Sequence, residues 1–212
     1  MKKILIIVFI IFANSLFFAQ NAAAIKLGFF NPNVTDGGFI IGFEGGKRID
    51  EALDICYSID WFKKNYTDKK FSAKVEQFVN IPGVDYELVG KTSLNSFPLM
   101  LSITAKIPLT PIIKPYLTGG FGGEMLVITY RDYVNPKKSK GEVAFDFNWR
   151  AGAGVIYVIG SKSNLFGEIT YHNSMPSFDY EVKDTNGNKR LFERVYDMRG
   201  LMIRMGVRYW YW

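Results

Sequence analysis

Few residues in this chain combine types and spacing that could do chemistry. His172 is the only histidine, and Ser174 follows two positions later, which places both side chains on one face of an extended strand. With Glu168 or Glu181 as the acid, they would supply the base, nucleophile and orienting group of a hydrolase triad. Only two residues carry this pattern, so we interpret them as polar residues at the rim of a strand and predict no enzyme.

Metal and cofactor chemistry has even less support. A single histidine cannot build a histidine-based metal cluster, and Cys56 is the only cysteine, so it has no partner for a disulfide. Residues 184–188 lack the glycine position of a calcium loop, and Asn186-Gly187 within them is typical of a tight hairpin turn. The sequence therefore predicts no cofactor and no metal site.

A larger group of charged residues recurs at alternate positions along the chain. If the face they share is enclosed, its six acids and six bases would balance one another as a network of salt bridges and hydrogen bonds. This set comprises Lys26, Glu44, Arg48, Asp54, Asp60, Lys106, Glu124, Asp146, Arg150, Glu168, Arg204 and Arg208. We expect its arginines to pair with acids on neighbouring strands, so that the partner of Arg150 is Glu124, Asp146 or Glu168.

The elements that would position these charges are segments in which apolar and polar side chains alternate with period two, the pattern of a β-strand. Residues 143–157 show it most clearly, with apolar or aromatic side chains at the odd positions. The alternation predicts eight strands, at residues 25–31, 37–47, 51–63, 95–107, 115–130, 142–158, 164–173 and 195–211.

Alternation alone does not decide which face is outside, because a soluble eight-stranded barrel alternates too. The polar face carries isolated charges and many glycines, which suits a cramped interior: Gly42, Gly46, Gly120, Gly122, Gly152, Gly154 and Gly206. The apolar face ends in aromatics of the kind that form interfacial girdles. The expected girdle comprises Tyr57, Trp61, Tyr116, Trp149, Tyr157, Tyr171, Tyr209 and Tyr211. We therefore predict an all-β protein, a transmembrane antiparallel up-and-down β-barrel of eight strands.

The N-terminus has the order of a cleavable signal peptide: Lys2 and Lys3, an apolar run over 4–12, then small residues. We assign 1–24 to this signal, with cleavage between 15 and 24, and 25–212 to the barrel. An uncleaved anchor helix fits less well, because the apolar run is shorter than the roughly 20 residues of a membrane span. Without the two lysines, 24 basic residues face 20 acidic ones, a balance too mild to indicate nucleic-acid binding.

Long and short connections alternate between the expected strands, as in bacterial barrels with both chain ends in the periplasm. The first connection, 32–36, is the exception, because it is short on the side of the long loops. The long connections are 64–94, 131–141 and 174–194. In the last of them, 178–182 and 191–195 flank Asn186-Gly187, and in the first, 75–79 and 86–89 flank Pro82-Gly83. We expect both to form ribbons whose strand edges could pair with another protein. Residues 137–140 are basic and could meet lipopolysaccharide phosphates.

Four motifs carry a resemblance to a known family: 115–123, 152–155 with 165–171, and 206–212. On these residues the chain resembles the small outer-membrane β-barrels that include the OmpA transmembrane domain, OmpX and OmpW. The resemblance implies location in the bacterial cell outer membrane, assembly by the barrel assembly machinery and a plugged interior. It also implies contact with outer-membrane lipid and lipopolysaccharide. Family members usually end on a lipid-facing aromatic, whereas here Tyr211 is in that phase and Trp212 is one past it.

These observations predict a non-enzymatic outer-membrane barrel with a plugged, charge-paired lumen. We expect a structural or surface role, with adhesion or binding of an extracellular protein through the loop ribbons, and a monomer. The alternative is a narrow channel for small apolar solutes, as the OmpW resemblance implies. A lipid A-modifying barrel enzyme built on His172 and Ser174 is the third interpretation.

Overall fold

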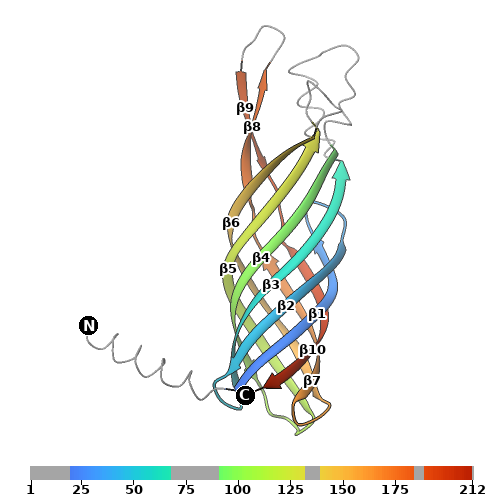
Figure 1. The fold of residues 1–212 in the computed structure, drawn as a ribbon, viewed down its shortest axis with the longest axis vertical. Coiled ribbons are helices and arrows are strands. Elements are labelled where there is room, and N and C mark those ends of the chain that lie inside the picture. Colours follow the sequence, from blue (N-terminus) through green and yellow to red (C-terminus); the bar gives the residue numbers. More distant parts are fainter. Residues whose placement is uncertain (1–19, 68–90, 132–138, 184–188, 212) are drawn as a thin grey trace, which may run out of the picture.

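The fold is a closed antiparallel barrel of eight strands, from which a two-stranded ribbon projects (Figure 1). The computed structural model describes residues 20–67, 91–131, 139–183 and 189–211. Around the barrel the strands follow the order β1-β10-β7-β6-β5-β4-β3-β2, and β8 pairs with β9. The described part of the chain contains no helix long and apolar enough to cross a membrane.

The barrel strands alternate in direction and vary from 11 to 20 residues in length. They are β1 (Gln20–Pro32), β2 (Gly38–Arg48), β3 (Leu53–Thr67), β4 (Lys91–Lys106), β5 (Ile113–Arg131), β6 (Ser139–Val158), β7 (Ser163–Asn173) and β10 (Gly200–Tyr211). The ribbon strands are β8 (Ser177–Lys183) and β9 (Lys189–Val195). The predicted fold class and the eight-strand count are confirmed.

Closure depends on β1, which pairs with both β2 and β10. Ile25 lies opposite Phe43 on one side and opposite Val207 on the other. Each barrel strand therefore has two hydrogen-bonded neighbours, and the sheet closes on itself. Residues 139–148 of β6 extend past β7 and pair with β5. A closed wall is what a bilayer demands of strands, because lipid offers no partner to an unpaired backbone group.

Several strand boundaries differ from the predicted ones. β3 ends at Thr67 rather than at 63, and β4 begins at Lys91 rather than at 95, so both extend into the connection predicted at 64–94. β1 begins at Gln20 rather than at 25, because the alanine-rich stretch after Gln20 pairs along β2 and β10 although it shows no polar alternation. The strand predicted over 195–211 is divided between β9 and β10. Between them the carbonyls of Asp197 and Arg199 accept backbone hydrogen bonds from the β1–β2 connection. The polypeptide thus leaves the ribbon, where β9 pairs with β8, and joins the wall as β10, which pairs with β1 and β7.

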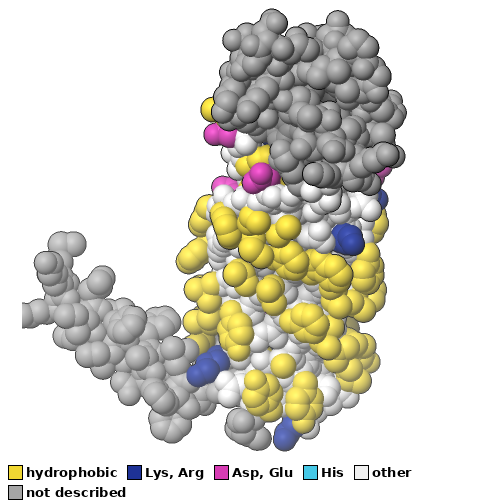
Figure 2. Space-filling view, turned by 45° about the horizontal axis from the view of Figure 1, so that its top comes forward, with side chains coloured by type: hydrophobic (Ala, Val, Ile, Leu, Met, Phe, Trp, Pro, Cys, Tyr) yellow, Lys and Arg dark blue, Asp and Glu magenta, His cyan; other side chains and the backbone are white. Residues whose placement is uncertain are grey.

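The two faces of the wall differ as the alternation predicts. Figure 2 shows hydrophobic side chains covering much of the visible outer surface of the barrel. Phe145 on β6 and Met205 on β10 are among the outward residues, 73% and 71% exposed. On this surface the ring of Tyr57 lies over Gly45 of the neighbouring strand, where a methyl group would collide with it. Such cross-strand packing of an aromatic ring on glycine stabilises the register.

The inner face is as cramped as its glycines suggest. A methyl group added at Gly122 would overlap the carbonyl oxygen of Leu99 on the neighbouring strand, so a side chain would push the wall apart. The other predicted interior glycines are buried or half-buried. Glycine is therefore required at Gly122 by the close approach of two strands.

The turns and ribbons lie at opposite ends of the barrel. Short turns join the strands at the end that carries both termini of the barrel. In the turn between β2 and β3, Asp50 Oδ1 accepts hydrogen bonds from the amides of Ala52 and Leu53, both at 2.7 Å. The β8–β9 ribbon projects from the other end (Figure 1), and this predicted ribbon is confirmed. The ribbon predicted within 68–90, the turn at 186–187, the basic residues 137 and 138, and the signal segment 1–19 lie outside the described residues.

Candidate functional site

The candidate site is the barrel interior, which side chains from all eight barrel strands fill. Most of the charges predicted to face inward are buried there, and Arg48 and Asp146, nearer the two ends, are half-buried. The buried ones are Lys26, Glu44, Asp54, Asp60, Lys106, Glu124, Arg150, Glu168, Arg204 and Arg208. The strands place them inside because each occupies the inward phase of its pleat.

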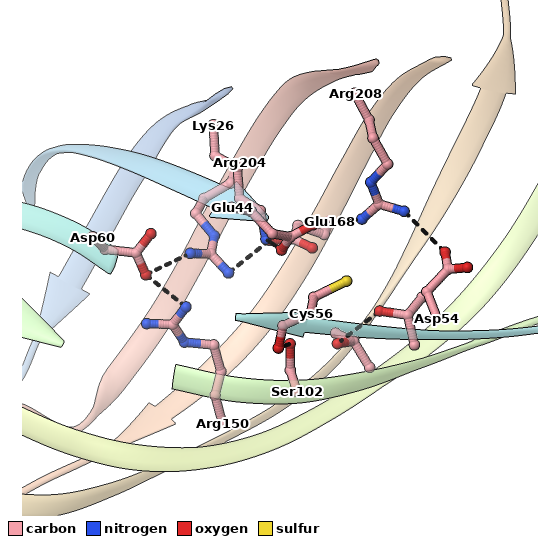
Figure 3. A network of polar contacts seen from close by, with 12 residues as sticks. Lys26, Glu44, Asp54, Cys56, Asp60, Ser102, Arg150, Glu168, Arg204 and Arg208 are labelled. Atoms are coloured by element: carbon pink, nitrogen blue, oxygen red, sulfur yellow. Dashed lines mark hydrogen bonds and ion pairs between the residues drawn. The ribbon is translucent and has the colours of Figure 1, made fainter. Parts of the chain in front are cut away.

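Nine of these side chains form a series of ion pairs across the lumen, in which positive and negative groups alternate; we call it the ion chain. Figure 3 shows its members apart from Lys106. In order of contact the nine side chains are Arg150, Asp60, Arg204, Glu168, Lys26, Glu44, Arg208, Asp54 and Lys106. Each interior member touches two groups of opposite charge. That arrangement offsets part of the cost of removing charges from water.

Arg204 and Glu168 form the centre of this chain. Arg204 donates from Nη1 to Asp60 Oδ2 at 2.9 Å, and its Nη2 lies 2.6 Å from Glu168 Oε1. Lys26 lies 3.4 Å from the same Glu168 oxygen and forms a second ion pair with Glu44. These contacts involve five barrel strands, so the side chains link opposite sides of the barrel wall across the lumen.

The chain continues toward the end with the short turns. Arg208 pairs with Glu44 at 2.7 Å and with Asp54 at 3.2 Å, and Lys106 pairs with Asp54 at 2.8 Å. Trp210 lies beside these cations, with its ring centroid 5.7 Å from the Arg208 guanidinium carbon. A cation over an aromatic face gains further stabilisation where water is excluded.

Strand β5 contributes Tyr116, and the expectation that this residue belongs to the outer girdle is wrong. Tyr116 is buried, and its hydroxyl donates to Glu168 Oε2 at 2.8 Å. Its position has the same parity as Glu124, which also faces inward on β5. The period-two rule would have placed Tyr116 inside. The other seven girdle aromatics are exposed on the outer face.

The partner expected for Arg150 is also wrong. Arg150 Nη1 donates to Asp60 Oδ2 at 2.7 Å, so its partner comes from β3, across the lumen, rather than from β5, β6 or β7. An arginine side chain is long enough to span a narrow interior. Adjacency in the sheet therefore does not determine which charges meet.

His172 belongs to a second polar cluster, which contains a different acid from those predicted. His172 Nε2 lies 2.8 Å from Glu124 Oε2, and Ser96 Oγ donates to Glu124 Oε1 at 2.6 Å. Ser174 Oγ donates to Asp146 Oδ2 at 3.2 Å. His172 and Ser174 are fully buried, so the pair lies inside the wall and not at an accessible rim.

Of the two glutamates expected as the acid of a triad, Glu168 is not in this cluster. Glu168 is engaged by Arg204, Lys26 and Tyr116, and the side chain of Glu181 lies outside the described residues. Among the residues that the structure describes, no group of three or more histidine, cysteine or acidic side chains is arranged to hold a metal ion.

Toward the ribbon end, apolar side chains fill the interior, which sequence reasoning missed. Phe30 and Phe62 pack edge to face with their centroids 5.1 Å apart, and Phe30 meets the His172 ring at 5.6 Å. The fully buried apolar residues of this end include Phe30, Ile40, Phe62, Leu94, Leu126, Ile128, Tyr196, Met198 and Met202. The sequence pattern that could have indicated them is an apolar residue at an inward-facing position near the ribbon end of a strand. The lumen therefore has two fillings in series, one ionic and one apolar.

The segment that joins β9 to β10 holds an ion pair outside the membrane-spanning part of the wall. Arg199 donates from Nε and Nη2 to the two carboxylate oxygens of Asp197, at 2.8 and 2.7 Å, and Asn33 donates to the same carboxylate at 3.3 Å. The hydrogen bonds from Arg199 lower the pKa of Asp197 to about 2. This pair ties the base of the ribbon to the β1–β2 connection.

Comparisons with known proteins agree with this architecture. Residues 10–198 match the family described as outer membrane protein beta-barrel domain. A search of curated proteins gives no match. Among solved structures, the outer membrane protein OprG from Pseudomonas aeruginosa superposes with a TM-score of 0.63 at 13% identity, over 91% of this chain and 96% of that one.

Two further solved structures show the same fold. A major outer membrane protein from Thermus thermophilus gives a TM-score of 0.60 at 12% identity, over 91% of this chain and 99% of the other. Neisserial surface protein A gives 0.56 at 12% identity, over 90% and 96%. At such low identity these likenesses establish the barrel alone. Together with the family match, they show that this chain belongs to the outer membrane protein beta-barrel domain family and is a protein of the bacterial outer membrane.

Proposed function

We propose that this protein is a non-conducting, non-enzymatic surface barrel whose filled interior makes a rigid base for the projecting β8–β9 ribbon. The observation that carries the proposal is the alternating ion chain, whose contacts involve every barrel strand once Tyr116 of β5 is included. An eight-stranded barrel has an interior only wide enough for side chains, and here paired charges occupy it. Ions that entered would have to break several buried salt bridges.

Single-channel recording in planar bilayers tests the closed lumen. We expect no reproducible conductance from the refolded wild-type barrel, because the ionic and apolar fillings block the same path in series. A general porin inserted into the same bilayers serves as the control for insertion and detection. Stable, reproducible current steps from the wild type would contradict the proposal.

The conduit for apolar solutes stays a second candidate, because the ribbon end of the lumen is lined by apolar side chains such as Phe30, Phe62 and Met202. An apolar solute that enters at the ribbon end and leaves sideways into the bilayer requires only these residues to move apart, whereas ion conductance through the lumen also requires the ion chain to open. Uptake of a small apolar dye into liposomes that contain the barrel, without ion conductance, would favour this candidate.

The binding role rests on the ribbon. Within the described residues β8 and β9 pair only with each other, so each presents one free strand edge, and Leu191 and Val195 on β9 are exposed. A free edge can accept a strand of another protein through main-chain hydrogen bonds. The partner we propose is therefore an extracellular protein with an extended segment.

Cell attachment tests this role. In one variant, 177–195 are replaced by a short Gly-Asn-Gly turn, and in a matched control Asp179→Ala changes a side chain but keeps both edges. We expect cells with the shortened barrel to lose attachment to protein-coated surfaces, while cells with Asp179→Ala attach as the wild type does. Equal attachment by all three, at equal surface abundance, would refute the binding role and leave the closed barrel intact.

A further inference from the structure

The ion chain has one more positive than negative member. Five cations (Lys26, Lys106, Arg150, Arg204 and Arg208) alternate with four carboxylates (Glu44, Asp54, Asp60 and Glu168), so both ends of the chain are cations. Lys106 ends the chain at the last residue of β4, beside the short turns. Arg150 ends it in the middle of β6, deep in the lumen. The remaining buried carboxylate, Glu124, lies outside the ion chain and is bound by His172 and Ser96, so Arg150 has only Asp60, which it shares with Arg204.

A small cavity of about 20 Å³ lies beside the Arg150 end. Arg150, Arg204 and Lys26 line it with positive charge, and Ser58, Ser102 and Thr118 line it with hydroxyl groups. Glu168 is the acid in its lining, and that carboxylate already receives contacts from Arg204, Lys26 and Tyr116. The volume suits a single water-sized occupant.

The unpaired polar atoms at this cavity are donors. Nε and Nη2 of Arg150 and Nε of Arg204 are buried and have no hydrogen-bond partner among the described residues. A guanidinium group can only donate, so whatever satisfies these atoms must accept. Asp60 Oδ1 also lacks a partner within the described residues, but it lies against Gly42 and does not line the cavity.

We propose that this cavity binds one monatomic anion, with chloride as the physiological candidate, held by Arg150 and Arg204 and by the hydroxyl of Thr118. A water molecule could accept the same hydrogen bonds but would leave three cations facing one carboxylate in the lining of a low-dielectric cavity. A monovalent anion accepts the hydrogen bonds and also balances that charge, and it completes the alternation beyond Arg150. The inference rests on the closed, charge-paired lumen of the proposed function.

Chloride-dependent stability tests the site. The refolded barrel is unfolded in urea at fixed sodium concentration, with chloride progressively replaced by gluconate, which is too large for the cavity. We expect the unfolding midpoint of the wild type to rise with chloride concentration, because a ligand that binds only the folded state stabilises it. The dependence on chloride should saturate, which general screening by salt at constant ionic strength does not produce.

Two variants and a control locate the effect. Arg150→Lys keeps the charge that faces Asp60 but removes the two unpaired donors, so it should lose the chloride dependence. Thr118→Val keeps the side-chain shape, removes one hydroxyl and should weaken the dependence if Arg150→Lys does not fold. Arg208→Lys alters the same ion chain away from the cavity, so its chloride dependence should match that of the wild type, whatever its stability.

Crystals soaked in sodium bromide give a direct observation. We expect one anomalous peak between the Arg150 and Arg204 guanidinium groups. A midpoint independent of chloride, or a cavity that holds water with no bromide peak, would overturn the anion site. If either result is found and planar bilayers show no conductance, the anion site is wrong and the closed lumen stands. Reproducible ion conductance would instead overturn the closed lumen, on which the anion site rests.

Discussion

At the scale of single residues, Arg150 shows how a buried charge is held in this barrel. Its guanidinium reaches Asp60 across the lumen, and Asp60 also accepts from Arg204. Removal of Arg150 therefore leaves Asp60 with one of its two partners. The decrease in the free energy of unfolding should be large, but smaller than for a buried carboxylate left with no partner.

We predict that Arg150→Ala lowers the free energy of unfolding by about 3 kcal/mol, near the lower end of the values for a broken buried ion pair. Urea titration in detergent micelles measures it. A double-mutant cycle with Asp60→Asn should give a coupling of about 1–3 kcal/mol. The same cycle with Glu124→Gln should be additive, because Glu124 contacts His172 and Ser96. Coupling of Arg150 to Glu124 and not to Asp60 would show that the Arg150–Asp60 ion pair is wrongly assigned.

The Asp197–Arg199 pair gives a pH dependence outside the membrane. Because the pKa of Asp197 is lowered to about 2 in the folded protein, from about 3.9 in an unfolded chain, its contribution is present above pH 4 and is lost as the pH falls toward 2. Arg199 is exposed, so water screens the pair and its contribution to stability is small. We predict that the stability difference between wild type and Asp197→Asn shrinks between pH 4 and pH 2. A difference that stays constant across that range in urea titrations would contradict the assigned pair.

At the scale of elements, the period-two alternation predicted the strands because each inward or outward position has a distinct environment in a membrane wall. It failed at Gln20–Ala24, where small side chains give no contrast between the faces. It also missed the apolar filling at the ribbon end, since inward residues such as Phe30 and Phe62 look like lipid-facing ones in sequence. The partner of Arg150 could not be predicted either, because side-chain reach across the lumen depends on three-dimensional closure.

The lipid-facing register of β6 has a direct test. Val155 is an outward residue of this strand, 47% exposed, and we predict that Val155→Arg costs about 2–4 kcal/mol in unfolding free energy, as a charge near the bilayer midplane does. Gly160, in the turn, has open space around it. Gly160→Arg should therefore change stability by less than about 0.5 kcal/mol. Equal costs for the two variants in urea titrations would mean that the assigned faces are wrong.

The start of β1 limits where a signal peptide can be cut. Gln20 lies opposite Arg48, and Ala22 and Ala24 are buried in the wall. Cleavage after residue 24 would delete five residues of a strand that closes the barrel. We therefore predict, within the cleavage range expected from the sequence, a mature N-terminus at or before Gln20. Intact-mass measurement of protein purified from outer membranes checks this, and a mature chain that starts at Ile25 would contradict it.

At the scale of the whole molecule, closure and interior packing act together. Every wall strand is paired on both sides, and the interior links strands that are not neighbours. We predict that the mature protein refolds in detergent micelles as a β-rich monomer whose mobility in gel electrophoresis changes on boiling. Circular dichroism and unheated gels measure this. A helical spectrum, or a mobility unaffected by heating, would show that the closed barrel does not form.

The order in which the ion chain visits the strands also bears on how the barrel is made. It runs from β6 to β3, β10, β7, β1, β2, again β10 and β3, and finally β4. The early strands do not neutralise all their own charges, since Asp60 on β3 takes both its partners from β6 and β10, and Lys26 on β1 takes one of its two from β7. Hairpins inserted one at a time would carry bare charges into the bilayer. We therefore expect the late strands to be in place when the early ones enter, so that insertion is a single concerted step.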